Sequence, residues 1–528
     1  MLRGAGALAI AAVALVHTRA WRFICDDAYI SFRYAQNLAE HGTLAYNVVA
    51  PRELIEGYTN FLWVMLLALG DRLGLAPDGL APVLTQVAVI AALGAVVWLG
   101  RGLRGGWPLA PALLLACSPE FMVWGQGGLE TALAAALTFA AMAAAASGRW
   151  RAAGVVTALA GLTRPDALLP IGLFFGTWLI VHGRKSWPGW RRLLVGGLLA
   201  AGPLVVHLLW RHSYYGSWVP NTWFIKQFGG LLRGTYGVWY VESWARAVGL
   251  VAIVPLLPWL RWRHLVLVVP IAGTVAWAWA IGGDFMAYSR FLLPATVLAA
   301  LAIGLSLARL DELLAARASA RARVLALASL VGLALVLLAL RIPTRIAVDH
   351  EHAHIHVDPD DASGPGFESV RAMDRFARIR LVAGARLREL VPPDTWISVG
   401  AAGALPYASN LPAFDAYGLV DPSVLEHAEP DTGPRARPGH QLHAPLARVL
   451  AREPDLMCHI GWDAERAPTR ADARRRAGPG WAWACVETGP IPDPHGETGT
   501  LESRYYCCLR PHDRFEALDP TGASRWPK

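Results

Sequence analysis

Repeated apolar stretches of nearly membrane-spanning length constrain this chain more than any other feature. They run over residues 4–21, 80–100, 107–124, 129–147, 152–182, 193–211, 244–260, 264–281, 291–308 and 323–341. Each is close to the about 20 residues that a helix needs to cross about 30 Å of hydrocarbon. Only 17% of the residues are charged, below the about 25% typical of soluble domains. We therefore predict a polytopic α-helical membrane protein.

Two segments decide the number of spans. The stretch 152–182 is long enough for two short helices, and Pro165 with the charges of Arg164 and Asp166 favours a turn between them. The segment 59–70 contains only about ten consecutive apolar residues, too few to cross. We interpret it as a re-entrant or interfacial helix on the outer side, which gives about 11 spans in total.

Loop charge orients these spans. In this topology the inner loops, together with Arg3, carry 15 basic and two acidic residues, while the other 12 acidic residues of positions 1–341 lie outside. A crossing at 59–70 would reverse this bias, so the positive-inside rule favours an inner N-terminus and an outer C-terminus. We expect the C-terminus, and the loops with most of the acidic residues, on the outer side of the membrane. The loops also account for the pI of 9.3, and no nucleic-acid partner is predicted.

The composition changes after Arg341. Residues 342–528 carry 21 basic and 26 acidic residues and no apolar span, and their number suits one domain. Strand-like runs at 396–399 and 456–460 alternate with helix-like runs at 372–390 and 444–452. We predict a membrane domain over 1–341 and an extracytoplasmic α/β or α+β domain over 342–528.

Cysteine and histidine patterns in this second part leave alternatives open. Four cysteines lie in this part: Cys458, Cys485, Cys507 and Cys508. They contain no CxxC pair, which argues against a zinc ribbon. If this part is exported they could form one or two disulfides, and the alternative is four free thiols. For the adjacent Cys507 and Cys508 we expect one disulfide partner and one buried thiol. Four histidines alternate within 349–361 and would share one face of a strand able to bind a divalent metal. We interpret this run as a solvated linker and assign no metal ligands.

Two adjacent carboxylates, Asp26 and Asp27, open the first outer loop, residues 22–79. Both are also suited to capping the helix that follows them. Functionally, one of them is a candidate general base, because a sugar hydroxyl needs a carboxylate within hydrogen-bond reach to attack an anomeric carbon. The second would raise the pKa of the first or orient the acceptor.

Isolated polar groups recur at the predicted outer ends of the other spans. Charges at membrane depth are costly, so they pair with one another or serve a site. Arg164, Lys226 and Arg290 are the cations available for a lipid-linked phosphate. The remaining predicted substrate-binding residues of the outer loops are Arg33, Glu56, Tyr58, Glu130, Asp166, Tyr215, Asn221 and Asp284.

These residues resemble a known family. The runs Asp26-Asp-Ala-Tyr-Ile-Ser-Phe-Arg-Tyr-Ala and Glu56-Gly-Tyr-Thr-Asn-Phe-Leu-Trp are similar to polyprenyl-phosphate-sugar-dependent GT-C glycosyltransferases, closest to the branch of the mycobacterial terminal arabinofuranosyltransferases. Leu162-Thr-Arg-Pro-Asp, Gly282-Gly-Asp-Phe-Met and Ala402-Gly-Ala-Leu-Pro-Tyr agree in order. The resemblance implies a periplasm-facing, inverting transferase in which Asp26 or Asp27 is the base. The partners of such a transferase would be a polyprenyl-phosphate sugar, membrane lipid and an envelope glycan or glycolipid. The resemblance does not determine which sugar is transferred.

Three other functions compete with this one. Within the same class, another pentose or hexose would be transferred to lipopolysaccharide or exopolysaccharide. A transporter of lipid-linked glycans would show matching inverted halves, and the sequence shows no such symmetry. A non-catalytic envelope assembly factor would use the exported domain as its interaction surface.

Overall fold

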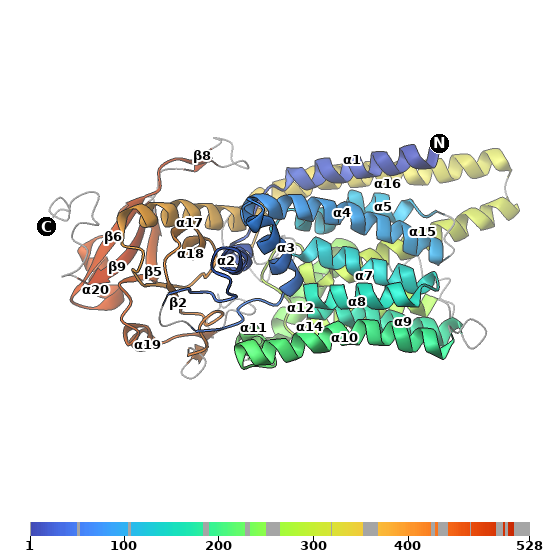
Figure 1. The fold of residues 1–528 in the computed structure, drawn as a ribbon. Coiled ribbons are helices and arrows are strands. Elements are labelled where there is room, and N and C mark those ends of the chain that lie inside the picture. The colour runs from blue at the N-terminus through green and yellow to red at the C-terminus, as the bar shows by residue number, and fades with distance from the viewer. Residues whose placement is uncertain are drawn as a thin grey trace.

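The molecule consists of a bundle of long helices and a C-terminal part built around a mixed sheet (Figure 1). The computed structural model describes residues 2–49, 53–103, 107–182, 189–227, 233–249, 264–317, 319–351, 368–423, 428–430, 442–464, 466–492, 500–501 and 505–511. The bundle helices are α1 (Leu2–Ala20), α4 (Pro77–Gly102), α5 (Ala110–Ala116), α6 (Pro119–Met122), α7 (Thr131–Ala146), α8 (Trp150–Thr163), α9 (Leu168–His182), α10 (Trp190–Tyr215), α12 (Arg233–Trp244), α14 (Leu265–Ala280), α15 (Leu293–Arg317) and α16 (Ala320–Glu351). The connections contain α2 (Asp26–His41), α3 (Phe61–Arg72), α11 (Asn221–Gln227) and the short turns η1 (Val123–Gly125), η2 (Pro165–Ala167), η5 (Ala245–Gly249) and η8 (Arg290–Leu292).

Four helical segments among the described residues are long and apolar enough to cross a membrane: Pro77–Gly102, Pro165–His182, Trp190–Tyr215 and Arg290–Ala316. Shorter apolar helices cover Gly4–Ala20, Thr131–Ala146 and Leu265–Ala280. Helix α10 presents Leu198, Val206 and Leu209 with 62%, 66% and 57% of their surface exposed. Apolar side chains exposed along a whole helix are what a lipid-facing helix carries.

Two expectations about the helices have clear outcomes. The predicted break in 152–182 is confirmed, because α8 ends at Thr163 and α9 begins at Leu168. The expected single helix over 107–124 is wrong: α5 ends at Ala116, and Pro119 begins the separate helix α6. A proline at the first position of a helix is favourable, whereas inside a helix it removes a hydrogen bond. The segment 59–70 forms the 12-residue helix α3, and α16 continues past residue 341 to Glu351.

Helices α8 and α10 approach closely through glycines. A Cβ atom on Gly196 would lie 2.7 Å from the carbonyl oxygen of Trp150, and one on Gly154 would overlap the carbonyl of Gly196. Small residues that let helix backbones meet are typical of packing between membrane helices.

The C-terminal part contains a five-stranded sheet in the order β2-β1-β5-β9-β6. Its strands are β1 (Ile397–Val399), β2 (Ala413–Asp415), β5 (Leu456–Ala464), β6 (Trp481–Glu487) and β9 (Tyr505–Pro511). β1 is parallel to β2 and β5, while β9 is antiparallel to β5 and β6. Helices α17 (Val370–Leu390), α18 (Ala404–Ser409), α19 (Leu446–Leu450) and α20 (Arg470–Ala477) accompany the sheet, as do the short pairs β3 (Glu429–Pro430) with β4 (Leu442–His443) and β7 (Ile491–Pro492) with β8 (Thr500–Leu501). The predicted mixture of helices and strands is confirmed.

Two disulfides join neighbouring antiparallel strands of this sheet. Cys458 of β5 is bonded to Cys508 of β9, and Cys485 of β6 is bonded to Cys507 of β9. The expectation that one of the adjacent cysteines is a thiol is therefore wrong. Adjacent strand residues point to opposite faces, so each of the two meets a different partner strand on its own face.

Only the first residues of the histidine-containing segment 349–361 belong to the described structure. His350 lies in the last turn of α16 and not in a strand. His352, His354 and His356 lie outside the described residues.

Asp349, at the end of α16, contacts the start of α17. Its carboxylate accepts hydrogen bonds from the N–H groups of Val370 (2.8 Å) and Arg371 (3.0 Å) and so caps α17.

Candidate active site

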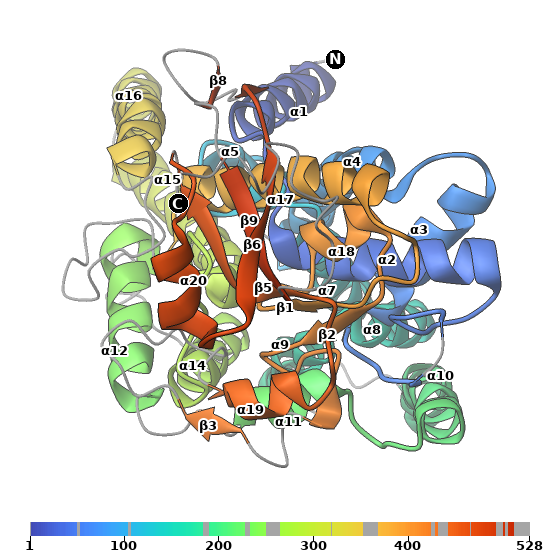
Figure 2. The same ribbon diagram turned by 90° about the vertical axis from the view of Figure 1, so that its left-hand side faces the viewer.

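A cavity of 380 Å³ lies between the start of α2 and the C-terminal part. Its walls come from both parts of the chain: Asp26 and Asp27 of α2, the turn at 285–286, α17, the loop after β1 and the strand β5. In Figure 2, α2 lies behind α18, and Figure 1 shows α2 between α18 and the bundle. A volume of this size is typical of small-molecule sites.

Asp26 joins α2 to the C-terminal part. Its carboxylate accepts hydrogen bonds from the N–H groups of Gly403 (3.2 Å) and Ala404 (2.9 Å) at the start of α18. Cys25 occupies the N-cap position of α2, so neither aspartate caps that helix as the sequence suggested. Exclusion of water raises the pKa of Asp26 from 3.8 to about 6, opposed by the hydrogen bond from Ala404. Asp26 is thus engaged on both of its oxygens.

Asp27 has a different environment. It is partly buried, lines the cavity, and accepts no hydrogen bond within the part of the chain that the structure describes. Lys226, the penultimate residue of α11, and Arg290 of η8 both interact with it electrostatically. A carboxylate that faces a cavity without a hydrogen bond from the protein is available to a ligand.

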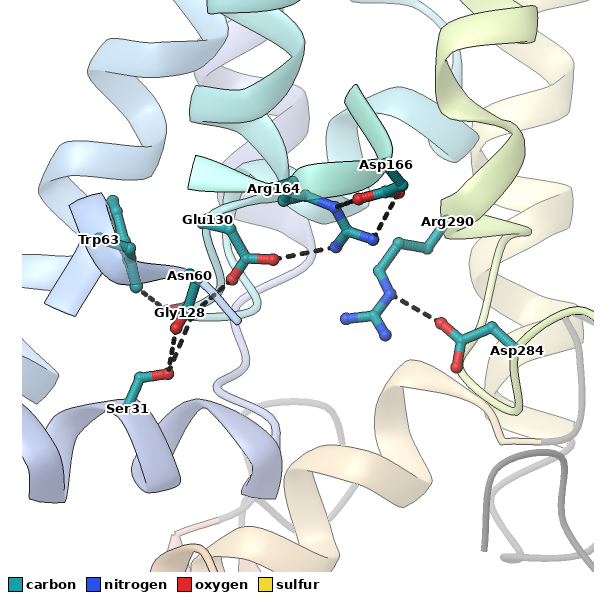
Figure 3. Close-up of polar contacts among 9 residues, drawn as sticks. All are labelled: Ser31, Asn60, Trp63, Gly128, Glu130, Arg164, Asp166, Asp284 and Arg290. Carbon is teal, nitrogen blue, oxygen red and sulfur yellow. Dashed lines mark hydrogen bonds and ion pairs between the residues drawn. The ribbon is translucent and has the colours of Figure 1, made fainter. Parts of the chain in front are cut away.

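A chain of polar contacts runs from α2 into the bundle (Figure 3). Glu130 accepts hydrogen bonds from Asn60 Nδ2 (2.7 Å) and from Arg164 (2.9 Å). Arg164 also binds both oxygens of Asp166, at 3.0 and 2.9 Å. The guanidinium of Arg164 is therefore held by two carboxylates, as expected for a cation at membrane depth.

Arg290 forms a hydrogen bond to the described residues through only one of its guanidinium nitrogens. Its Nε donates to Asp284 (2.7 Å), and its two Nη atoms, directed away from Asp284 in Figure 3, make no hydrogen bond with any described residue. The guanidinium groups of Arg164 and Arg290 lie 5.4 and 5.2 Å from the centre of the Phe291 ring. Both arginines also border a narrow cavity of 30 Å³ lined mainly by apolar side chains of α7, α9, α14 and α15. The guanidinium groups of Arg164 and Arg290 therefore border a mainly apolar cavity.

The other predicted substrate-binding residues lie where the parts of the chain join. Arg33 donates to the carbonyls of Tyr46 (2.8 Å) and Leu411 (2.8 Å) and to that of Pro406. Asn221 donates to the carbonyls of Gly418 and Leu419. Such contacts between α2, α11 and the C-terminal part fix their relative positions.

Glu56 and Tyr58 belong to the same framework. Glu56 forms a buried ion pair with Arg211 of α10, at 2.6 Å, and burial raises the pKa of Glu56 to about 6 while Arg211 opposes the rise. The hydroxyls of Tyr58 and Tyr215 lie 3.1 Å apart, and that of Tyr215 donates to the carbonyl of Leu44 (2.9 Å). Asp27 therefore lies within electrostatic range of Lys226 and Arg290. By contrast, the side chains of Arg33, Glu56, Tyr58, Tyr215 and Asn221 make contacts that hold the parts of the chain together.

Sequence reasoning missed the cavity wall contributed by the C-terminal part. Glu368, Arg380, Tyr417 and His459 line the cavity from that side. Oγ of Ser398 and Nδ1 of His459 are 2.7 Å apart, and burial lowers the pKa of His459 to about 4. The loop at residues 402–407, which belongs to the family resemblance, was a sequence signal near this wall. Among the described residues, no group of three or more His, Cys, Asp or Glu side chains is arranged to hold a metal.

Parts of the chain are similar in sequence to a domain family and to a curated protein. Residues 370–489 match a domain of unknown function, DUF8728. The terminal beta-(1->2)-arabinofuranosyltransferase of Mycobacterium tuberculosis (strain ATCC 25618 / H37Rv) is 30% identical over 274 residues, which cover 47% of this chain and 40% of that protein. The match thus spans less than half the length of this curated relative.

The similarity in structure extends over nearly the whole chain. The apo crystal structure of ArnT from Cupriavidus metallidurans has a TM-score of 0.56 at 12% identity and covers 96% of this chain and 98% of ArnT. A second ArnT structure, bound to undecaprenyl phosphate, has a TM-score of 0.47 at 17% identity and covers 79% and 88%. The TM-score of 0.56 shows that the chain has the fold of ArnT. The predicted resemblance to the mycobacterial terminal arabinofuranosyltransferase is confirmed over 274 residues.

Proposed function

We propose that the chain is an integral-membrane glycosyltransferase that moves a sugar from a polyprenyl-phosphate donor to a cell-envelope glycan or glycolipid. The observation that carries the proposal is the cavity beside α2, where the carboxylate of Asp27 faces open space within the electrostatic reach of Arg290 and Lys226. A base and a phosphate-binding cation are the two groups that this transfer requires. The protein would lie in the bacterial inner membrane with about 11 spans and the cavity on the outer side.

The relatives support the donor class. ArnT is known in a form bound to undecaprenyl phosphate, and the mycobacterial relative is named an arabinofuranosyltransferase. In this chain the Nη atoms of Arg290, which make no hydrogen bond with a described residue, would bind the phosphate. The polyprenyl chain would extend along apolar helices of the bundle next to Arg290. Arabinofuranose is accordingly the first donor sugar to test.

The reaction assigns a separate role to each aspartate. Asp27 would take the proton of the acceptor hydroxyl while the oxygen of that hydroxyl forms a bond to the anomeric carbon of the donor sugar. The bond from that carbon to the phosphate oxygen breaks, and polyprenyl phosphate leaves with the electron pair. Asp26 would act as a positioning residue, because its carboxylate is bonded to the start of α18. Displacement from the opposite side inverts the anomeric centre.

The test is transfer of a labelled sugar by the purified chain in lipid nanodiscs. Polyprenyl-phosphate arabinofuranose, other pentoses and hexoses are offered with arabinan, lipopolysaccharide and exopolysaccharide acceptors, with and without EDTA. We expect Asp27→Asn to lower kcat by about 10²-fold or more, as for loss of a general base, without a change in unfolding temperature. The matched control is Glu40→Gln on the exposed end of α2.

Two results would overturn the proposal. Turnover of Asp27→Asn at the wild-type rate would remove Asp27 from the mechanism. Absence of turnover with every donor, combined with movement of a lipid-linked glycan across the bilayer, would instead support a transporter. Loss of activity on adding EDTA would establish the divalent-metal requirement that the sequence left open.

A further inference from the structure

A second cavity, of 370 Å³, lies on the other side of the segment that leads into α2. It is bounded by the end of α1, the first half of α4 and the middle of α17. Ile24 lines this cavity, while the next residue, Cys25, already lines the first one. The transfer mechanism uses no residue of this second cavity.

The lining of this cavity carries an excess of positive charge. Arg19, Arg22 and Arg378 supply three guanidinium groups, and Asp374 supplies the single carboxylate. Arg378 donates to Asp374 through Nε (2.6 Å). Arginine is the side chain best suited to bind a phosphate with two hydrogen bonds.

Two largely buried residues of the same lining have polar side chains without a hydrogen bond in the described part of the chain. Tyr29 and Gln126 are 3% and 5% exposed, and neither side chain makes a hydrogen bond with any other described residue. Buried polar groups are rarely left without a hydrogen bond. Because both residues line the cavity, a ligand there would supply the missing partners.

Exposed apolar side chains flank the mouth of this cavity on both helices. Val16 precedes Arg19 by three residues on α1 and is 71% exposed; Val83 and Val87 lie beside Gln86 on α4 and are 56% and 62% exposed. Helical residues three apart share a face. The surface therefore changes within one turn from apolar to cationic, which fits a ligand with an acyl chain and an anionic head.

We propose that this cavity binds the phosphate headgroup of an anionic membrane lipid. Arg19 and Arg22 would bind the phosphate, the Tyr29 hydroxyl and the Gln126 amide would bind the glycerol or phosphate oxygens, and the acyl chains would lie along Val16 and Val83. Basic sites of this kind at the edge of membrane helices attract anionic lipids over zwitterionic ones.

The full chain, purified in detergent and stripped of lipid, tests the proposal by native mass spectrometry. The protein is mixed with equimolar palmitoyl-oleoyl phosphatidylglycerol and phosphatidylcholine, without a sugar donor, so the result is independent of the transfer reaction. We expect preferential retention of phosphatidylglycerol. The double variant Arg19→Gln/Arg22→Gln should bind it about tenfold more weakly, as for loss of charged hydrogen bonds. The control Arg386→Gln/Arg388→Gln removes the same charge from the exposed end of α17 and should bind it normally.

A second variant separates binding from folding. Tyr29→Phe removes only a hydroxyl that makes no hydrogen bond with the described residues, so its unfolding temperature should stay at the wild-type value. Its affinity for phosphatidylglycerol should fall about fivefold, as for one hydrogen bond. Equal retention of both lipids, or wild-type affinity in the Arg19/Arg22 double variant, would overturn the proposal. Displacement of the lipid by millimolar inorganic phosphate would show a site for the free ion instead.

Discussion

At the scale of single residues, the Asp26 carboxylate makes stability depend on pH. Its pKa is about 6 in the folded protein and 3.8 ordinarily. Between these values the folded protein binds more protons than the unfolded chain, so the free energy of unfolding falls as pH rises. We expect the unfolding temperature of the wild type to fall across this window by more than that of Asp26→Asn, which does not titrate there. A constant difference between the two curves would contradict the raised pKa.

The ion pair of Glu56 with Arg211 is the second residue-scale test. The side chains are only 2% and 7% exposed, so removing one partner leaves a buried charge without compensation. We expect Glu56→Gln to destabilise the protein by about 3 kcal/mol or more, and the double variant Glu56→Leu/Arg211→Met to recover most of this loss. Thermal unfolding in detergent measures both. Glu242→Gln, in an exposed pair with Arg246, is the control and should be nearly neutral.

At the scale of elements, the contact between α8 and α10 depends on a glycine. A Cβ on Gly196 would press against the backbone oxygen of Trp150, whereas one on the adjacent Gly197 would meet nothing within 4 Å. We expect Gly196→Ala to cost about 1–3 kcal/mol through overpacking. Gly197→Ala should be neutral or slightly stabilising, since alanine favours the helix. Equal unfolding temperatures for the two variants would show that α8 and α10 are not in close contact.

The elements also show what the sequence can and cannot predict. Apolar length and Pro165 were sufficient to predict α8, α9 and the turn between them, because both signals are local. The interruption at Pro119 was missed, since the apolar run continues on both sides of it. Asp27, which lines the cavity, was singled out because charge beside an apolar span is conspicuous. Arg380 and His459 were not, because only long-range folding brings α17 and β5 to α2.

At the scale of the whole molecule, the disulfides bear on where the C-terminal part resides. Cys458–Cys508 and Cys485–Cys507 require an oxidising compartment, in agreement with the predicted outer C-terminus. We expect a reporter that is active only outside the cytoplasm, such as alkaline phosphatase, to be active when fused after residue 528. Activity of a cytoplasmic reporter at that position would overturn the predicted topology.

Loss of a disulfide should affect the whole molecule as well. We expect Cys485→Ser/Cys507→Ser to lower the stability of the C-terminal part by about 2–5 kcal/mol. Because that part forms one wall of the cavity beside Asp27, sugar transfer should fall with it. Cys117→Ser removes a buried free thiol and serves as the control. Unfolding curves with and without reductant measure the effect, and a wild type insensitive to reductant would contradict it.

The neighbouring positions of Cys507 and Cys508 have a consequence for biosynthesis. Four cysteines allow three pairings, and exchanging the partners of these two would require β9 to turn over, moving Tyr506 and Leu509 to the opposite face of the sheet. A chain oxidised in the wrong order would therefore be trapped with β9 inverted and the cavity wall misplaced. Production of active protein in a foreign host should consequently depend on the disulfide isomerase activity of that host as much as on its membrane-insertion machinery.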